Sequence, residues 1–248
     1  MIVIRINADD FGLNSSCTKA ICEAFERELI TDTTMVANGA AFDEAVAIMK
    51  QYDMNKKIGI HFNLTEGLPL TSKIKSCDSF VKDGIYHGKI NRNKWLNKKE
   101  REAVYEELTA QVMRLKDAGI GITHADSHHH VHTCIFIAPI VVRVCKEYKI
   151  KKIRLHRNIG SISLCKRAVK KIYNIWLSLN RFRTVKYFGS MEDVENVGIK
   201  DQLEIMVHPE YDENGELIDK TDEKNGLAIG KILKIPRGKY ILEGYSDL

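Results

Sequence analysis

The most restrictive feature of the sequence is a series of short apolar runs that alternate with longer amphipathic segments. Six runs rich in branched residues, most of them followed by a polar cluster, are typical of β-strands: residues 2–6, 57–60, 119–123, 152–155, 203–207 and 239–242. A seventh and weaker candidate covers residues 33–36. Apolar residues recur at helical spacing in five segments: 18–28, 42–52, 98–118, 135–148 and 163–179. This alternation predicts parallel βαβ units, and therefore an α/β fold with a mostly parallel sheet or a (β/α) barrel.

The helix expected at residues 98–118 has recognisable ends. Asn97 and Glu100 are spaced as a capping box at its start, and Gly119 suits the position just after its end. The stretch 72–97 fits no simple βα unit, so we expect an insertion there, near the mouth of the site. The sequence contains no linker and no repeat, which predicts one domain over residues 1–248.

Composition excludes several classes of protein. The formal charge of +5 is mild, and the basic residues between 146 and 171 lack the interleaved aromatics of a stacking platform. They predict a solvated helix face and no nucleic-acid partner. The six cysteines form no C-x-x-C pair, which argues against a zinc ribbon. The start of the chain lacks a signal-peptide core, and the longest apolar run, 135–142, is too short to span a bilayer. We therefore expect a cytoplasmic protein without a membrane partner, and a homodimer is compatible with the sequence.

Polar side chains follow several of the predicted strands. They are Asp9, Asp10, His61, Asp126, His128 and His208. In (β/α) barrels the functional groups lie at the carboxyl ends of the strands, so these side chains should converge on one face although they are far apart in sequence.

Five of the nine histidines lie within residues 124–132, which points to a metal site, a proton relay or a His-rich solvated loop. Two histidines and a carboxylate can hold a metal with positions open for water and substrate, and the bound water becomes a nucleophile near neutral pH. A second carboxylate can then accept a proton, and a further histidine can protonate the leaving group. Asp9 and Asp10 are adjacent, so on an extended backbone they point to opposite sides and should have different roles.

Four motifs occur in a specific order: NADDFG at 7–12, GIHFNLT at 59–65, THADSHHHVH at 123–132 and EIMVHP at 204–209. Together with TTMVAN at 33–38 and GYSD at 244–247, they resemble the YdjC-like carbohydrate deacetylases, which include the chitooligosaccharide deacetylases. The resemblance runs from residue 2 to the C-terminus and is weaker over 73–97 and 161–198. It implies a distorted (β/α) barrel that removes acetyl groups from N-acetylated sugars with one divalent metal ion. By position in the motifs, Asp10, His61 and His128 would be the metal ligands, Asp9 the general base and His208 the general acid.

Other polar residues have open assignments. His132 would face the same metal as His128 on a helical turn, but would contact substrate or support the ligands if the segment is a loop. Asp126 is expected to orient an imidazole by a hydrogen bond. Asn38 and Thr65 are candidates for substrate contacts or for a supporting role. His124 and His156 are as consistent with packing as with function, and His129 and His130 have no role that the sequence indicates. Imidazole ligands suit zinc, nickel or cobalt, whereas the resemblance implies magnesium as often as zinc.

Three classes of function fit these residues. The first is hydrolysis of the N-acetyl amide of a mono- or oligosaccharide. The second is metal-dependent phosphoester hydrolysis, which usually needs a second metal and more carboxylates than the motifs contain. The third is a non-enzymatic metal-binding module, which leaves Asp9, Asp10, His61 and His208 unexplained.

Overall fold

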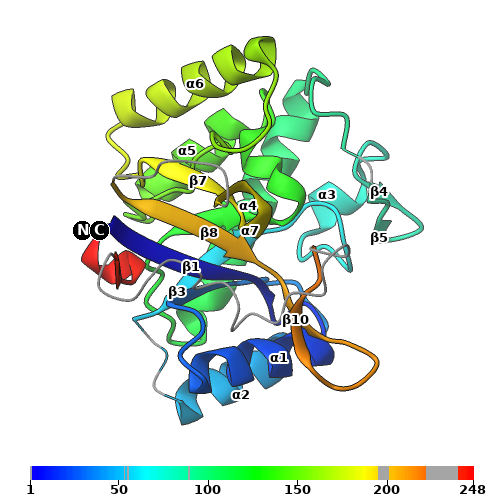
Figure 1. Ribbon diagram of the computed structural model, residues 1–248. Coiled ribbons are helices and arrows are strands. Elements are labelled where there is room, and N and C mark those ends of the chain that lie inside the picture. Colours follow the sequence, from blue (N-terminus) through cyan, green and yellow to red (C-terminus); the bar gives the residue numbers. More distant parts are fainter. Residues whose placement is uncertain (1, 53, 55, 89, 195–200, 222–239) are drawn as a thin grey trace.

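The computed structural model describes residues 2–52, 54, 56–88, 90–194, 201–221 and 240–248, and its centre is a curled sheet of parallel strands (Figure 1). The order across the sheet is β6–β3–β2–β1–β8–β7, and a further strand, β11, pairs with the first residues of β1. The bounds are β1 Ile2–Phe11, β2 Asp32–Met35, β3 Ile58–Phe62, β6 Ala125–Ser127, β7 Tyr187–Ser190, β8 Leu203–Val207 and β11 Tyr240–Leu242. All of these pairings are parallel.

Two single bridges extend the curl of the sheet. Ala125 in β6 pairs with Ile153, and Lys152 pairs in turn with Arg183, a few residues before β7. The strands thus follow one another around a distorted barrel. At residues 152–153 the barrel is formed by isolated bridges rather than by a regular strand. The prediction of an α/β fold with mostly parallel strands is confirmed.

Helices cover the outside of the sheet, with α1 and α2 on one side and α4, α5 and α6 on the other (Figure 1). Their bounds are α1 Ser15–Glu26, α2 Phe42–Gln51, α3 Ser72–Lys75, α4 Lys98–Asp117, α5 Ala138–Glu147, α6 Leu164–Leu179 and α7 Met191–Val194. The five helices expected from periodicity are all present, and their ends lie within a few residues of the predicted ones. The capping box of α4 is confirmed, since Asn97 Oδ1 accepts from Glu100 N and Glu100 Oε2 accepts from Asn97 N, each at 2.9 Å.

Several strand predictions were wrong in their bounds. β1 and β3 extend past the predicted runs 2–6 and 57–60, so Asp9, Asp10 and His61 lie inside strands rather than after them, and β7 was not predicted. The strand expected at 119–123 is found instead at residues 125–127, as β6. Asp126 is therefore inside a strand rather than after it. The run 152–155 is not a regular strand. It forms only two isolated bridges, from Ile153 to Ala125 and from Lys152 to Arg183. The structure adds two hairpins, β4 (Val81–Lys82) with β5 (Ile85–Tyr86), and β9 (Pro209–Tyr211) with β10 (Leu217–Asp219). The first of these, with α3, occupies the irregular stretch 72–97; Lys239, expected in the last strand, lies outside the described residues.

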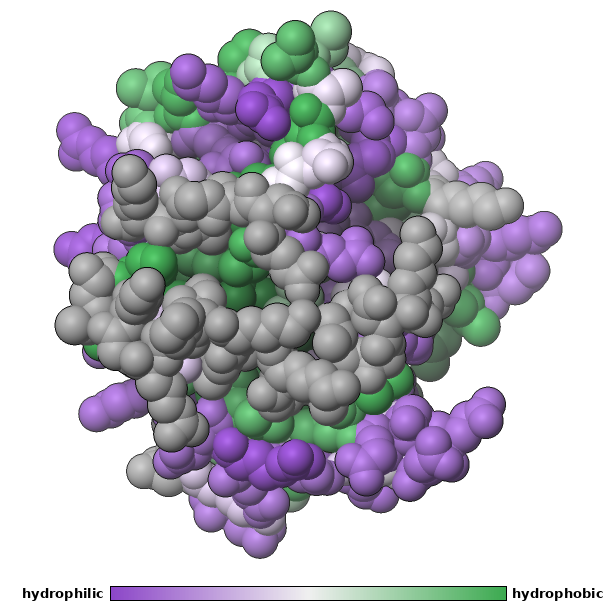
Figure 2. Space-filling view, viewed as in Figure 1, coloured by the Kyte–Doolittle hydropathy of each residue, from purple (hydrophilic) through white to green (hydrophobic). Residues whose placement is uncertain are grey.

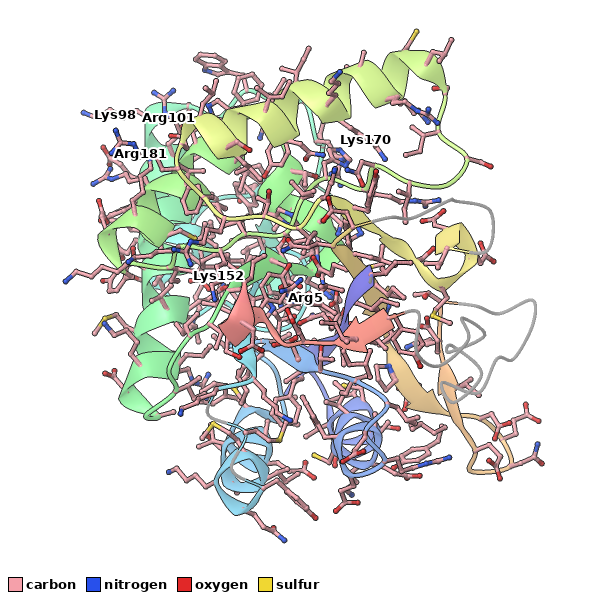
Figure 3. All side chains as sticks on the ribbon, turned by 60° about the vertical axis from the view of Figure 1, so that its left-hand side comes forward. Arg5, Lys98, Arg101, Lys152, Lys170 and Arg181 are labelled. Atoms are coloured by element: carbon pink, nitrogen blue, oxygen red, sulfur yellow. The ribbon has the colours of Figure 1, made fainter. Side chains whose placement is uncertain are left out.

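Strand β1 is buried on both faces, and the two faces differ in chemistry. Ile4, Ile6 and Ala8 are fully buried in the apolar core, and the residues that alternate with them are Arg5, Asn7 and Asp9, also buried. Arg5 and Lys152, labelled in Figure 3, lie beside the C-terminal segment; Arg5 Nε donates to Gly244 O at 3.2 Å and Lys152 Nζ donates to Tyr245 O. One row of β1 therefore builds the core, and the other carries polar groups through the interior towards the strand ends.

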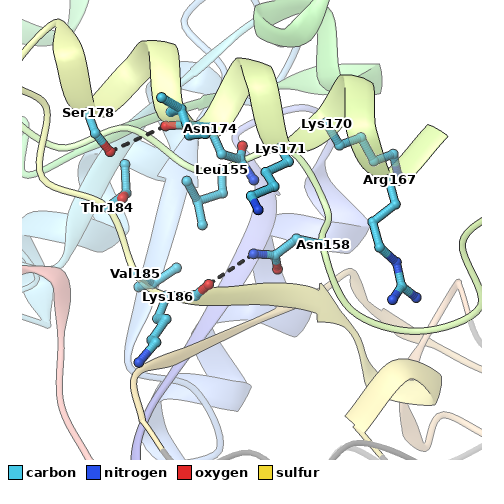
Figure 4. A pocket seen from close by; sticks show the side chains of 11 residues that line it. Leu155, Asn158, Arg167, Lys170, Lys171, Asn174, Ser178, Thr184, Val185 and Lys186 are labelled. Atoms are coloured by element: carbon cyan, nitrogen blue, oxygen red, sulfur yellow. Dashed lines mark hydrogen bonds between the residues drawn. The ribbon is translucent and has the colours of Figure 1, made fainter. Parts of the chain in front are cut away.

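Helix α6 is attached to the body by few buried residues. Only Leu177 in it is fully buried, whereas Leu164 and Leu179 are 81 % and 76 % exposed, and apolar side chains of this region reach the surface at the top of Figure 2. A groove of about 390 Å³ separates α6 from the residues before β7, and Figure 4 shows Arg167, Lys170 and Lys171 along it. The basic residues of α6 are thus solvated or half-buried, as predicted, but the prediction was wrong for Arg154, which lies in the same stretch and is fully buried. None of the described helices combines the length and apolarity needed to cross a membrane.

Candidate metal centre and active site

The backbone at the end of β1 separates the two adjacent carboxylates. Asp10 has a left-handed conformation with φ of 74°, and the pairing of β1 with β2 shifts register between Ala8 and Phe11. Such a bulge re-aims side chains, and left-handed backbone is strained in residues other than glycine. Asp9 continues the buried polar row of β1, whereas Asp10 faces the histidines with 13 % of its side chain exposed. The expected divergence of the two side chains is observed, and Asp10 takes its direction from an irregular, left-handed backbone.

Two imidazoles converge on one oxygen of Asp10. His61 Nε2 lies 3.1 Å from Asp10 Oδ1, and His128 Nδ1 lies 2.7 Å from the same atom. These histidines come from the end of β3 and from the turn after β6, two strands that are neighbours in the sheet. Despite burial, hydrogen bonds from His128 and His61 hold the pKa of Asp10 well below its usual range. Ligand atoms of the three residues lie within 4.8 Å of one another, so their number, type and spacing fit one divalent ion.

Asp126 orients the first of these histidines. Its Oδ1 lies 2.7 Å from His61 Nδ1, and Thr34 Oγ1 lies 2.9 Å from the same nitrogen and donates to Asp126 Oδ2 at 3.0 Å. Burial disfavours charge on His61, but the Asp126 and Asp10 carboxylates outweigh it and raise the pKa of His61 to about 10. The contact leaves Nε2 directed at Asp10, as the expected orienting role of Asp126 requires.

Arg154 is the main component that the sequence interpretation missed. It is fully buried, and its Nη1 and Nη2 donate to the two oxygens of Asp9 at 2.6 and 2.7 Å. Nη1 also lies 2.6 Å from Asp126 Oδ2, and Nε donates to Glu204 Oε1 at 2.6 Å. Against the cost of burial, Arg154 lowers the pKa of Asp9 far below its usual range. The signal in the sequence that could have identified Arg154 is its place as a charged residue within the predicted strand 152–155.

His208 is placed beside Asp9 at the end of β8. Its Nε2 lies 3.9 Å from Asp9 Oδ2, and its backbone N–H donates to Asp219 Oδ1 at 3.0 Å. Asp219, at the end of β10, was not singled out in the sequence. The imidazole is 21 % exposed, and its Nδ1 has no hydrogen-bond partner among the described residues. His208 therefore reaches the site beside Asp9, and its buried Nδ1 lies 4.0 Å from Asp219 Oδ1.

The histidine segment after β6 is a kinked 3₁₀ turn, His128–Thr133, rather than a regular helix. His129 and His130 both have left-handed backbone, with φ of 49° and 54°, and Arg92 donates to their carbonyls. Because of the kink, His132 does not join His128 at the centre. It is fully buried, with Nδ1 2.5 Å from Ser127 Oγ, and it does not belong to the group of ligand atoms formed by Asp10, His61 and His128.

The residues after β3 form a loop held by buried amides. Asn38 Nδ2 donates to the carbonyls of Glu66 and Leu68, each at 3.1 Å, and Asn63 Oδ1 accepts from Thr65 N at 2.9 Å. Asn38 and Thr65 thus form hydrogen bonds within this loop, and Thr65 Oγ1 also lies 3.1 Å from His129 Nδ1. The same loop directs the carboxylate of Glu66 to His128 Nε2 at 3.1 Å, a contact the sequence did not suggest.

Two further histidines have structural environments. His124 is buried, lies 2.9 Å through Nε2 from Asn7 Oδ1, and stacks on Tyr245 with ring centroids 3.7 Å apart. Gly59 faces it so closely that a β-carbon there would lie 2.7 Å from the His124 ring. The backbone of His156 is held by Asn174 of α6 through two hydrogen bonds, at 2.8 and 3.1 Å.

Comparison with known proteins identifies relatives by sequence and one solved structure with a similar fold. A protein of Listeria monocytogenes serotype 4a (strain HCC23) named carbohydrate deacetylase is 30 % identical over 213 residues, which cover 84 % of this chain and 81 % of that protein. A carbohydrate deacetylase of Brevibacillus brevis is 36 % identical over 146 residues, or 58 % of this chain and 56 % of the relative. A solved structure from Enterococcus faecalis V583, whose name assigns it provisionally to cellobiose-phosphate cleavage, superposes with a TM-score of 0.73 at 20 % identity and covers 99 % of this chain and 98 % of that one. That likeness shows a shared fold.

The family model described as YdjC-like protein matches residues 3–236, which include every residue of the centre described above. The chain therefore belongs to the YdjC-like protein family.

Proposed function

We propose that this protein is a metal-dependent carbohydrate N-deacetylase that hydrolyses the acetamide of N-acetylated mono- or chitooligosaccharides. The observation that carries the proposal is the convergence of His61 Nε2 and His128 Nδ1 on Asp10 Oδ1, with Asp9 and His208 3.9 Å apart beside it. Support also comes from relatives named carbohydrate deacetylase.

Asp10, His61 and His128 are the residues that would hold the divalent ion, with magnesium and zinc as the candidates. When bound, such an ion supplies a Lewis acid for the acetyl carbonyl and lowers the pKa of a water molecule. The alternative trio of Asp9, His61 and Asp126 also satisfies the geometric requirement for a metal. We favour the first set because Arg154 already occupies both Asp9 and Asp126.

Two residues of the centre are proposed to move protons. Asp9 is the proposed general base, and Arg154 keeps it ionised and fixes its orientation, at the expense of some basicity. His208 is the proposed general acid, because its partly exposed ring lies on the Asp9 side and can protonate the departing amine. The acetamide would then lie between the Asp10 side and the His208 side of the centre.

The two alternative functions have less support. A two-metal phosphoesterase would need a second set of free ligands, and the carboxylates nearest to the centre, Asp9 and Asp126, are paired with Arg154. A non-enzymatic metal-binding module would leave the arrangement of Asp9, Arg154 and His208 unexplained.

A product assay tests the proposal. The metal-loaded protein should release acetate from N-acetylglucosamine, chitobiose or longer chitooligosaccharides, and release should stop in His61→Ala and Asp10→Asn. Phosphate release from sugar phosphates would favour the phosphoesterase. Tight metal binding without any turnover across the substrate series would favour the binding module.

A further inference from the structure

Both ring nitrogens of His128 contact carboxylates. Nδ1 lies 2.7 Å from Asp10 Oδ1, and Nε2 lies 3.1 Å from Glu66 Oε2. A neutral imidazole carries its proton on one nitrogen only and can bind a metal only through the other. The partner of the protonated nitrogen therefore decides which nitrogen faces the metal.

We propose that Glu66 is a positioning residue of the metal centre: it accepts the Nε2–H of His128 and so assigns Nδ1 to the metal. The inference rests on the proposed function, because it assumes the ion held by Asp10, His61 and His128. It assigns a task to the one carboxylate of the loop after β3 that reaches the histidine segment.

The arrangement at His61 supports this assignment by comparison. There Asp126 contacts Nδ1 at 2.7 Å, and Nε2 is the nitrogen that faces Asp10. Each histidine thus has one nitrogen on Asp10 Oδ1 and the other on a separate carboxylate, but the nitrogens are exchanged. Hydrogen-bonded carboxylates behind ligating histidines fix the ring orientation and tautomer and raise the basicity of the ligand.

The backbone of Glu66 is held by hydrogen bonds to two asparagine side chains. Glu66 N donates to Asn63 Oδ1 at 3.1 Å, and Glu66 O accepts from Asn63 Nδ2 at 2.8 Å and from Asn38 Nδ2 at 3.1 Å. Asn63 in turn exchanges hydrogen bonds with Gln111 of α4, at 3.0 and 2.6 Å. Asn63 and Gln111 are fully buried, and buried amides are stable only when they are paired in this way.

Exposure separates the two supporting carboxylates. Asp126 is fully buried, whereas the Glu66 side chain is 54 % exposed. Water competes for the Glu66 contact, so we expect its removal to cost less than removal of Asp126. Loss of such a supporting partner typically weakens metal binding by roughly 10–100-fold, and Glu66→Ala should lie near the lower end of that range.

The first measurement is zinc affinity of the intact protein by chelator competition. Glu66→Ala should bind zinc about 10-fold more weakly than the wild type, and Glu66→Gln should lose less, because its amide oxygen can still accept from Nε2–H. The matched control is Glu213→Ala, which removes an exposed carboxylate on the turn between β9 and β10. Circular dichroism verifies that each variant is folded. Equal affinity of Glu66→Ala and the control would overturn the inference.

The second measurement identifies the ligating nitrogen, which a merely structural role of Glu66 would not affect. In protein loaded with ¹¹³Cd and labelled at histidine, coupling of the metal to ring protons distinguishes Nδ1 from Nε2 ligation. We expect Nε2 at His61 and Nδ1 at His128, with the His128 signal heterogeneous in Glu66→Ala. Ligation of His128 through Nε2 would overturn the inference. Retention of the ion by Asp10→Asn and His61→Ala would instead refute the metal site of the proposed function.

Discussion

Arg154 donates from Nη1 and Nη2 to the two carboxylate oxygens of Asp9, at 2.6 and 2.7 Å, in a fully buried pair. The same guanidinium also contacts Asp126 and Glu204, each at 2.6 Å. One fixed cation therefore serves three buried carboxylates, and Asp10 adds a fourth nearby. Even with His61 protonated, these four carboxyl groups outnumber the two cations beside them, Arg154 and His61, which favours occupation of the Asp10 site by a divalent cation.

Arg154→Met should destabilise the protein strongly. Removing one partner from a buried ion pair leaves uncompensated charge, at a typical cost of about 3–5 kcal/mol, and here three carboxylates lose their cation. The free energy of unfolding measured with urea tests this. Lys186→Met is the control, because its pair with Asp201 is exposed and solvent screens it, so its effect should be much smaller. Comparable losses in the two variants would show that Arg154 does not organise the interior.

Metal binding should release a proton from His61. In the metal-free protein the pKa of His61 is raised to about 10, so at pH 7–8 this imidazole is protonated and must lose its proton before it can bind an ion. Titration calorimetry in buffers of different ionisation enthalpy should give about one released proton per ion, and affinity should increase with pH. Release that is zero across pH 7–8 would contradict the raised pKa.

The same shift predicts how the metal-free protein responds to pH. Because the folded state holds the His61 proton more tightly, the resulting stability is complete below the ordinary histidine pKa of 6.5 and is lost as pH rises towards 10. The midpoint of urea unfolding should fall over this interval, and bound zinc should reduce the dependence.

Asp9→Asn should retain the metal and slow the reaction. General-base catalysis contributes about 10²–10⁴-fold, so the turnover number should fall within that range. Some loss of stability should accompany it, because the amide can no longer accept both hydrogen bonds from Arg154. Metal content and kcat are measured together. If Asp9→Asn empties the site while Asp10→Asn does not, the roles of the two aspartates are reversed.

His208→Ala should lower kcat with little change in metal content, because its ring contacts Asp9 rather than Asp10. A general acid must be protonated when the amine departs, so the alkaline limb of the pH–rate profile should flatten or move. The loss of kcat should be smaller for substrates whose leaving amine is a weaker base, because such an amine needs less help from an acid. Equal losses for good and poor leaving groups, with an unchanged profile, would leave His208 a positioning or structural residue.

Asp32→Asn should stabilise the protein at neutral pH. Burial raises the pKa of Asp32 from 3.8 to about 7, although Thr31 and the Tyr245 N–H donate to it. The folded state therefore prefers the protonated acid, and stability is lost as pH rises from about 4 to 7. Urea unfolding at pH 5 and pH 8 should show that the variant lacks most of this loss. The exposed substitution Asp117→Asn serves as the reference and should leave the difference between the two pH values unchanged.

The sequence by itself determined the fold class and most of the centre. Branched runs and helical spacing depend on burial of local faces, so the main strands and five helices could be located without knowing their neighbours. Because parallel strands present their carboxyl ends to one face, Asp9, Asp10, His61 and His208 could be assigned to a common site.

Only the tertiary structure decided what surrounds those residues. Arg154 and Asp9 are separated by 145 positions and Glu66 and His128 by 62, and no periodicity relates such pairs. The bulge at Asp10 and the left-handed turn at His129 and His130 are strained conformations that local preference disfavours, and packing around them maintains them. Ring orientation at His61 and His128 depends on carboxylates that approach from different elements. A motif therefore identifies which side chains meet, whereas the three-dimensional arrangement of charges and hydrogen bonds fixes which atom of each faces the metal.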